Sequence, residues 1–129
     1  MLTAIRDYFK NNFKWAEKIS IGKIDNNAEK AICFYTSNTA RPAAHMWGGR
    51  ALQSYRHKPV TILIRWGKGK QAAEDKAQAV FDFFEETQFA LMGKHAFCLS
   101  VYDGPIDLGT DENGIYEYSI ELDFYMKKE

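Results

Sequence analysis

The sequence predicts an α+β fold, with a single mixed, largely antiparallel β-sheet of about five strands and two helices packed on one face. Two segments have apolar residues at helical spacing, and the C-terminal segment alternates strictly between apolar and polar residues. The predicted order is helix, three strands, helix and two strands, so the helices are expected to cover one face of the sheet. The length of 129 residues suits one domain spanning residues 1–129.

The beginning of the chain predicts an amphipathic helix followed by a β-hairpin. Apolar residues recur three and four positions apart in the first segment, at Leu2, Ile5, Phe9 and Phe13. Two short strands are expected at residues 18–21 and 31–35, and the Asp-Asn-Asn sequence at 25–27 has turn chemistry. Two short strands separated by such a turn predict a hairpin.

A long connection, at about residues 37–59, has no clear periodicity. Connections this long are uncommon in a compact domain and are generally functional or mobile. This one is rich in residue types that are enriched at interface hot spots. We expect the segment from Arg41 to Lys58 to pack on another protein chain, and its candidate interface residues are Arg41, His45, Trp47, Arg50, Tyr55 and Arg56.

A strand at residues 60–66 and a helix from about residue 71 to about residue 89 are predicted next. Should the strands on either side of this helix be parallel neighbours, the helix forms a right-handed crossover. The Gly-Lys-Gly-Lys sequence at 67–70 lies where a phosphate-binding loop would begin a helix. It lacks the spacing of a Walker loop, and Gln71 replaces the hydroxyl residue that holds magnesium. A basic turn is the favoured interpretation.

The last third of the chain predicts a strand at 97–101, a turn-rich loop at 103–114 and a long strand at 116–126. The aspartates of the loop do not fit a calcium-binding register, so a turn with Asx hydrogen bonds is expected. In the last strand, apolar residues alternate with Glu117, Ser119, Glu121 and Asp123. This pattern predicts one buried face and one acidic, solvated face.

Charge is segregated along a chain whose net charge is zero. Residues 31–73 contain seven basic and no acidic residues, whereas residues 74–129 contain thirteen acidic and four basic residues. In one interpretation, basic and acidic strands lie side by side within one molecule. In the other, two opposite faces attract each other between copies, and such a head-to-tail contact gives a ring when its rotation closes. The sequence leaves both open.

No pattern for catalysis, a cofactor or a metal is present. The three histidines lack metal-ligand spacing, and His95 and Cys98, three residues apart in a strand, face opposite sides. Cys33 and Cys98 are expected to be buried thiols. We therefore expect a protein that is not an enzyme, binds no cofactor and inserts in no membrane. A small nucleic-acid-binding module using the basic, aromatic loop is an alternative from another class, although such modules usually have a basic overall balance.

Several segments together resemble the minor capsid proteins, or tail terminators, of long-tailed, siphovirus-type bacteriophages and prophages. These segments are residues 21–25, 32–35, 62–66, 106–117 and 123–125. The most specific run is Leu108-Gly109-Thr110-Asp111-Glu112-Asn113-Gly114-Ile115-Tyr116-Glu117.

The resemblance implies a virion assembly protein that forms a ring, typically a hexamer, on the last ring of the tail-tube protein. The ring stops tail polymerisation and offers a docking surface for the head connector, and DNA passes through it without specific binding. Assembly in the host cytoplasm and a final place at the head-proximal end of the tail follow. The acidic face with Glu117, Glu121 and Asp123 is a candidate lining of the hole or contact between subunits. A head–tail connector or completion protein is the alternative within this class.

Overall fold

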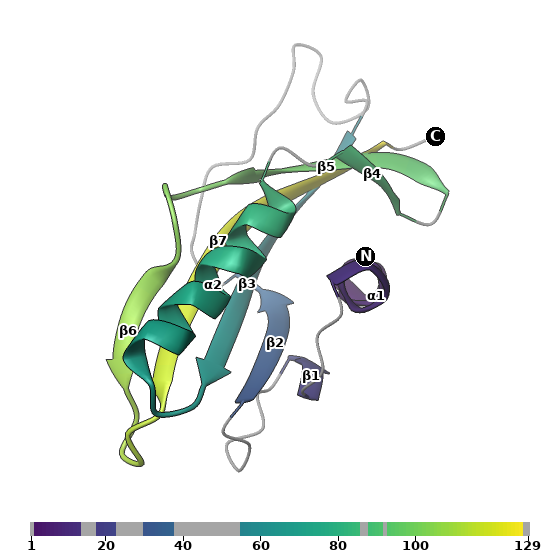
Figure 1. The fold of residues 1–129 in the computed structure, drawn as a ribbon. Helices are drawn as coiled ribbons and strands as arrows, with labels where there is room; N and C mark the ends of the chain where they lie inside the picture. Colours follow the sequence, from purple (N-terminus) through teal and green to yellow (C-terminus); the bar gives the residue numbers. More distant parts are fainter. Residues whose placement is uncertain are drawn as a thin grey trace.

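The computed structural model describes residues 2–13, 18–22, 30–37, 55–85, 88–91 and 93–127. It confirms the α+β class, with two helices and a curled mixed sheet, but the sheet has seven strands rather than five (Figure 1). The elements are α1 (Leu2–Phe13), β1 (Lys18–Ile21), β2 (Lys30–Thr36), β3 (Tyr55–Trp66), α2 (Lys70–Phe84), β4 (Gln88–Leu91), β5 (Lys94–Ser100), β6 (Ile106–Thr110) and β7 (Tyr116–Lys127). No helix in these ranges is long and apolar enough to span a membrane.

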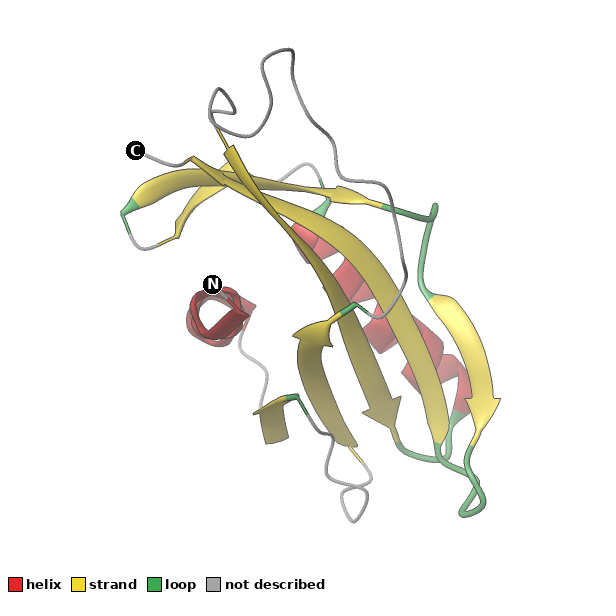
Figure 2. Cartoon of the chain, turned by 180° about the vertical axis from the view of Figure 1, so that it is seen from behind, coloured by secondary structure: helices red, strands yellow, loops and turns green. Residues whose placement is uncertain are grey.

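The sheet is organised around β7. Its strand order is β1-β2-β3-β7-β5-β4, and β6 pairs with β7 beside this path. Along one edge β7 pairs with β3, and along the other its first half pairs with β6 and its second half with β5. Only β1 and β2 run parallel; the other pairs are antiparallel. Figure 2 shows from behind how the sheet curls, and β1 and β4, at opposite ends of the strand order, both contact α1.

Both helices pack into one hydrophobic core on the same face of the sheet. α2 lies along β3 and β7, and α1 contacts β1, β2 and β4 (Figure 1). The ring of Phe9 packs within 6 Å of the rings of Phe13, Phe34, Phe83 and Phe84, which joins the two helices to β2. The alternation predicted for the last strand is confirmed, since its inward residues are buried: Tyr118, Ile120, Leu122, Phe124 and Met126.

The predicted hairpin at the start of the chain is wrong. β1 pairs with β2 in parallel, from Lys18 opposite Ala31 to Ile21 opposite Phe34. The turn residues 25–27 lie outside the described residues. A turn signal indicates that the chain changes direction, but it does not determine whether the next strand enters at the near or the far end of the previous one. Pairing with β3 fixes the direction of β2 instead.

The second helix is shorter than predicted, and a strand follows it. α2 ends at Phe84, because Glu85 has the extended backbone angles φ −68° and ψ 132°. Acidic residues at a helix C-terminus oppose the helix dipole and favour such an end. β4 then pairs with β5, and Phe89 of β4 is buried in the core rather than continuing the helix.

Two regions predicted to be loops contain strand residues. β3 begins at Tyr55, so residues 55–59 belong to the sheet and not to the connection at 37–59. Pro59 is tolerated because it lies just beyond the last β2 pair, Thr36–Val60, where its carbonyl accepts a hydrogen bond from the Ser37 N–H. β6 lies within the predicted loop at 103–114.

The strands on either side of α2 are not neighbours. β3 and β5 are both antiparallel to β7 and therefore parallel to each other, but β7 lies between them. The last strand of the chain is thus inserted into the centre of the sheet. This insertion brings the acidic C-terminal strand beside the basic strand β3.

Candidate assembly surfaces

Basic β3 and acidic β7 lie side by side, and polar side chains of one strand contact those of the other. Nη1 of Arg65 donates a hydrogen bond of 2.9 Å to the Glu117 carboxylate. His57 lies 2.9 Å from the Asp123 carboxylate. The structure therefore agrees with the first interpretation of the charge pattern, in which basic and acidic strands are neighbours within one molecule.

The carboxylate of Glu121 has neutral partners. Thr61 Oγ1 donates a hydrogen bond of 2.7 Å to one of its oxygens, and Ser37 Oγ donates one of 3.0 Å to the other. The candidate residues Glu117, Glu121 and Asp123 do share one face of β7, as predicted. Each of them also holds β7 to a residue of β3, so this face has a structural role within the subunit.

Arg65 also fixes the turn between β6 and β7. Nη2 of Arg65 lies 2.9 Å from the carboxylate of Asp111, and the side chain of Arg65 is only 2% exposed. Asp111 accepts hydrogen bonds from the backbone N–H groups of Asn113 and Ile115, which confirms the expected Asx turn. The hydrogen bond from Ile115 contributes most to holding the pKa of Asp111 below its ordinary value, with smaller contributions from Asn113 and Arg65. Within the most specific run of the sequence, residues 111–115 thus form a turn that backbone hydrogen bonds and Arg65 hold in place.

The candidate interface residues of the long connection are only partly within the described residues. Arg56 is exposed on β3, and Tyr55 pairs with Lys127 through its backbone. Arg41, His45, Trp47 and Arg50 lie outside the described residues, so their prediction stays a prediction.

The face of the sheet opposite the helices, here called the outer face, carries apolar and aromatic side chains. On it the rings of His57 and Phe97 each stack on the ring of Tyr125, at centroid distances of 5.0 and 5.1 Å. In the next row Leu99 lies opposite Asp123 and is 55% exposed. No helix packs on this face within the described ranges.

Sequence reasoning located β5 correctly but could not assign its faces. We took Phe97, Leu99 and Val101 as the marker of this strand, and the structure buries Ala96 and Cys98 in the core instead. Ala96 and Cys98 also alternate along the strand, and this second set of apolar residues was the only sign in the sequence that the other face could be the buried one. Phe97 and Leu99 therefore lie on the outer face, where Leu99 is 55% exposed.

The cysteines lie in surroundings that suppress reactivity. Both are buried and free, on strands β2 and β5, which are separated by β3 and β7. The Cys98 thiol donates a hydrogen bond to the Phe84 carbonyl oxygen, 2.8 Å away, and burial raises its pKa to about 12. His95 is exposed and lies 3.2 Å from Gln88. Within the described ranges, no group of three or more potential metal ligands is present.

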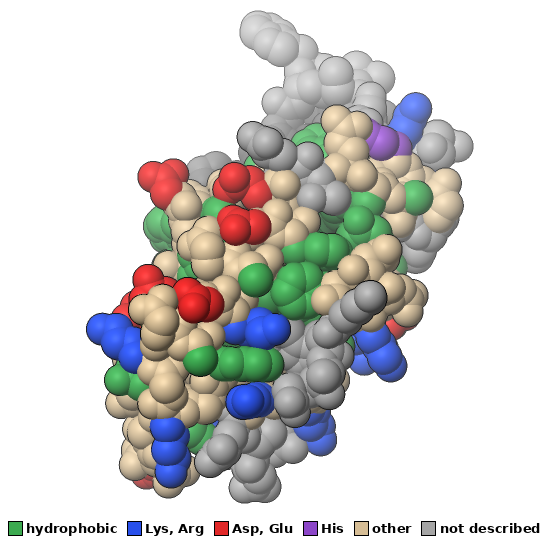
Figure 3. Space-filling model, in the orientation of Figure 1, with side chains coloured by type: hydrophobic (Ala, Val, Ile, Leu, Met, Phe, Trp, Pro, Cys, Tyr) green, Lys and Arg blue, Asp and Glu red, His purple; other side chains and the backbone are tan. Residues whose placement is uncertain are grey.

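A shallow, open cleft of about 270 Å³ lies between α2 and β6. It is lined by Lys70, Glu74, Gln78, Pro105, Asp107 and Tyr118. Lys70 belongs to the Gly-Lys-Gly-Lys sequence that was compared with a phosphate-binding loop. In the cleft it lies beside the acidic residues Glu74 and Asp107. Figure 3 shows acidic side chains gathered over α2 and toward β5 and β6, with basic ones mainly toward the lower border and the side of α1.

The family model described as bacteriophage tail terminator protein matches residues 10–127, which is nearly the whole chain and includes every strand. The chain has no significant match among curated proteins or solved structures. A match of this extent confirms the resemblance on which the expectations of ring and tail depend. The chain belongs to the bacteriophage tail terminator protein family.

Proposed function

We propose that the protein forms a ring of identical subunits, six in number, on the last ring of the tail-tube protein. There it stops polymerisation and presents a docking surface for the head connector. Family membership supports this role at the level of the tail terminator. The single structural observation that carries it is the outer face, whose stacked rings and exposed Leu99 remain without a helix in the described part of a small subunit.

A terminator must contact its own copies and two other proteins, which requires several distinct surfaces on one small body. The helices occupy one face of the sheet, so the outer face and the two lateral borders are available for these contacts. Interface cores are enriched in aromatic residues, and the His57–Tyr125–Phe97 stack fits that composition. We assign the end of the outer face that carries the His57–Tyr125–Phe97 stack to contact with the tube or connector.

The hole of the ring is proposed to carry DNA without binding it specifically. The acidic face with Glu117, Glu121 and Asp123 remains our candidate for the lining. The pairing of Glu117 with Arg65 fits a surface that neither attracts DNA phosphates nor repels them strongly. Assembly takes place in the host cytoplasm in this proposal, and the ring then remains in the virion.

Co-assembly with purified partners tests this function. The tail-tube protein of the same phage is polymerised with and without the chain, and tube ends are imaged by electron microscopy. We expect one ring on one end of each tube and shorter tubes as the chain is added. Binding to the purified head connector but not to the tube would favour a head–tail completion protein instead. Retention on heparin at moderate salt would favour a nucleic-acid-binding module.

A further inference from the structure

Two lateral borders of the subunit have complementary surfaces. β1 is the last strand at one end of the sheet, and β6 lies toward the opposite end beyond β7. Figures 1 and 2, drawn from opposite sides, agree that α1 and β1 form one border of the molecule and that β6 forms the other. Contacts at these two borders would join copies side by side.

The β5–β6 border, defined here as residues 99–108, exposes both large apolar and acidic side chains. The three large hydrophobic side chains that are most exposed in the described structure all belong to it: Leu99 at 55%, Tyr102 at 52% and Leu108 at 51%. Asp103 and Asp107 are exposed between them. Exposed large apolar side chains with charged residues among them are typical of a protein–protein contact.

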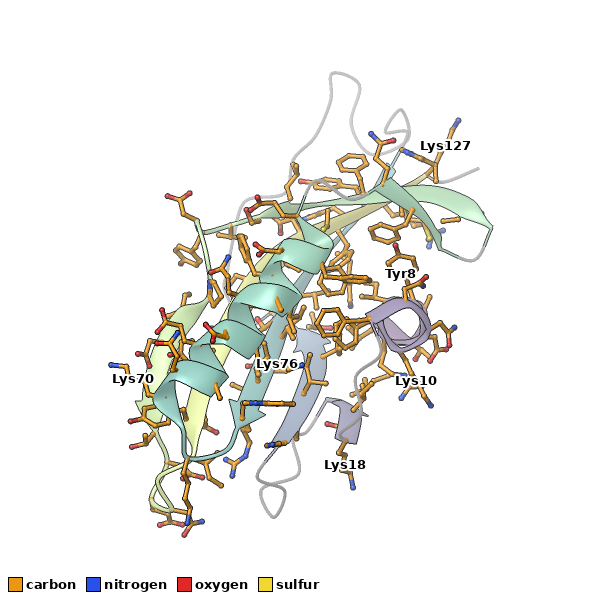
Figure 4. All side chains as sticks on the ribbon, viewed as in Figure 1. Tyr8, Lys10, Lys18, Lys70, Lys76 and Lys127 are labelled. Atoms are coloured by element: carbon orange, nitrogen blue, oxygen red, sulfur yellow. The ribbon has the colours of Figure 1, made fainter. Side chains whose placement is uncertain are left out.

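The α1–β1 border, defined here as α1, β1 and the first residue of β2, is basic. Lys10, Lys18 and Lys30 are exposed on it. Figure 4 shows the side chains of Lys10 and Lys18 directed away from the sheet. Asp7, the acidic residue of α1, is already paired with Arg6 at 2.9 Å.

We propose that the β5–β6 border of one subunit binds the α1–β1 border of the next copy. This inference rests on the proposed ring. The two borders are different surfaces of one chain, so the contact is head-to-tail, and a closing rotation turns it into a ring. Opposite charges at the rim select this pairing, because acidic borders facing each other, or basic borders facing each other, would repel.

Side chains, rather than a continuous sheet, make this contact. The pairing of β6 with β7 shifts register between Asp107 and Gly109, and Gly109 has a positive φ of 83°. A bulge of this kind disrupts the edge of a strand and prevents another strand from pairing with it. The β1 strand at the other border has only four residues. The apolar side chains at residues 99, 102 and 108 therefore supply the contact area.

The test uses charge reversal on each border separately. One variant carries Lys10→Glu and Lys18→Glu, and the other carries Asp103→Lys and Asp107→Lys. The control carries Lys68→Glu and Lys127→Glu, two exposed lysines outside both borders. Particle mass is measured by native mass spectrometry with the tail-tube protein of the same phage present, and thermal unfolding verifies that each variant folds.

Each border variant alone should give at least about a tenfold lower yield of rings than the wild type or the control. An equal mixture of the two border variants should restore rings with an even number of subunits, in which the two variants alternate. In such a ring the two reversed borders face each other with opposite charges, and so do the two unchanged borders. This rescue requires a head-to-tail contact between the two borders.

Rings formed equally well by both border variants would overturn the inference, as would a mixture that fails to restore them. Either result would leave the ring itself established. Failure of the wild type to form a ring on the tube would instead contradict the proposed function. If a double variant does not fold, the single variants Lys18→Glu and Asp103→Lys replace it, with the same rescue expected from their mixture.

Discussion

The guanidinium of Arg65 lies 2.9 Å from the carboxylate of Asp111, and this ion pair ties the β6–β7 turn to the strand β3. The same side chain bonds Glu117 through its other terminal nitrogen. One buried cation therefore holds two acidic residues of the most specific segment of the chain. The turn is fixed by the centre of the sheet and not only by its own hydrogen bonds.

Removal of Arg65 should destabilise the protein strongly. In the Arg65→Ala variant, Asp111 and Glu117 lose the cation that they share, and because the Arg65 side chain is only 2% exposed, the loss of stability should clearly exceed that of an exposed pair. The matched control is Arg6→Ala, because the Arg6–Asp7 pair has the same 2.9 Å distance but is largely exposed. That control should cost less than about 1 kcal/mol. Urea unfolding measures both, and equal losses would contradict the role assigned to Arg65.

The stability of the turn should depend on acidic pH through Asp111. Its pKa is lowered in the folded state, so the ionised carboxylate stabilises the fold. This contribution is complete above the ordinary value of 3.8 and is lost as the pH falls through the lower pKa of the folded state. The free energy of unfolding of the wild type should therefore approach that of Asp111→Asn at low pH. A difference between the two that is independent of pH would exclude this linkage.

The ring of Phe9 should be the main anchor of α1. Its side chain is fully buried and packs against rings from α2 and β2. Phe9→Ala should lower stability by about 3–5 kcal/mol, because it leaves a large cavity where three elements meet. Thr3→Ala on the exposed side of the same helix serves as the control and should change stability by less than about 0.5 kcal/mol. Thermal unfolding monitored by circular dichroism compares the two.

The two thiols should react only when the protein unfolds. Burial raises the pKa of both, that of Cys98 to about 12, so the reactive thiolate is scarce at neutral pH and reagents have no access. Labelling with a thiol reagent at pH 7.5 should be negligible in buffer and should reach two groups per chain in denaturant. Rapid modification of Cys98 in the folded protein would show that this part of β5 opens readily.

The basic residues before and at the start of β3 should contribute to assembly. Arg56 is exposed on β3, and Arg50 belongs to the connection for which we predict an intermolecular contact. The Arg50→Glu/Arg56→Glu variant should fold normally but bind tail tubes at least about tenfold more weakly. Sedimentation with tubes measures this binding, with Lys68→Glu/Lys70→Glu as the control of equal charge change. Binding equal to that of the control would remove this segment from the assembly surface.

Local periodicity made much of the fold predictable. The alternation from Tyr116 onward identified β7 and its buried face, and the spacing of Phe9 and its neighbours identified α1. The direction of β1 and the presence of β4 and β6 could not be predicted, because these short strands are stabilised by their partners. β6, for example, interrupts its pattern with the bulge near Gly109 and exists through its pairing with β7.

In the candidate site too, local periodicity predicted some features, whereas others depend on which strands pair. The acidic face with Glu121 could be read from alternation alone. Its partner Thr61 could not, since their contact depends on the insertion of β7 beside β3. The apolar border was missed for a related reason: Leu99 has the sequence pattern of a core residue, and only the orientation of β5 leaves it exposed.

The most direct test of the terminator role is the length distribution of tail tubes in infected cells that lack this protein. Tubes are imaged by electron microscopy in lysates of a phage whose copy of the gene is deleted, with the wild-type chain supplied from a plasmid in a parallel culture. We predict overlong tubes without heads in the deletion, and tubes of uniform length attached to heads on complementation. Tubes of normal length attached to heads in the absence of the protein would contradict the account.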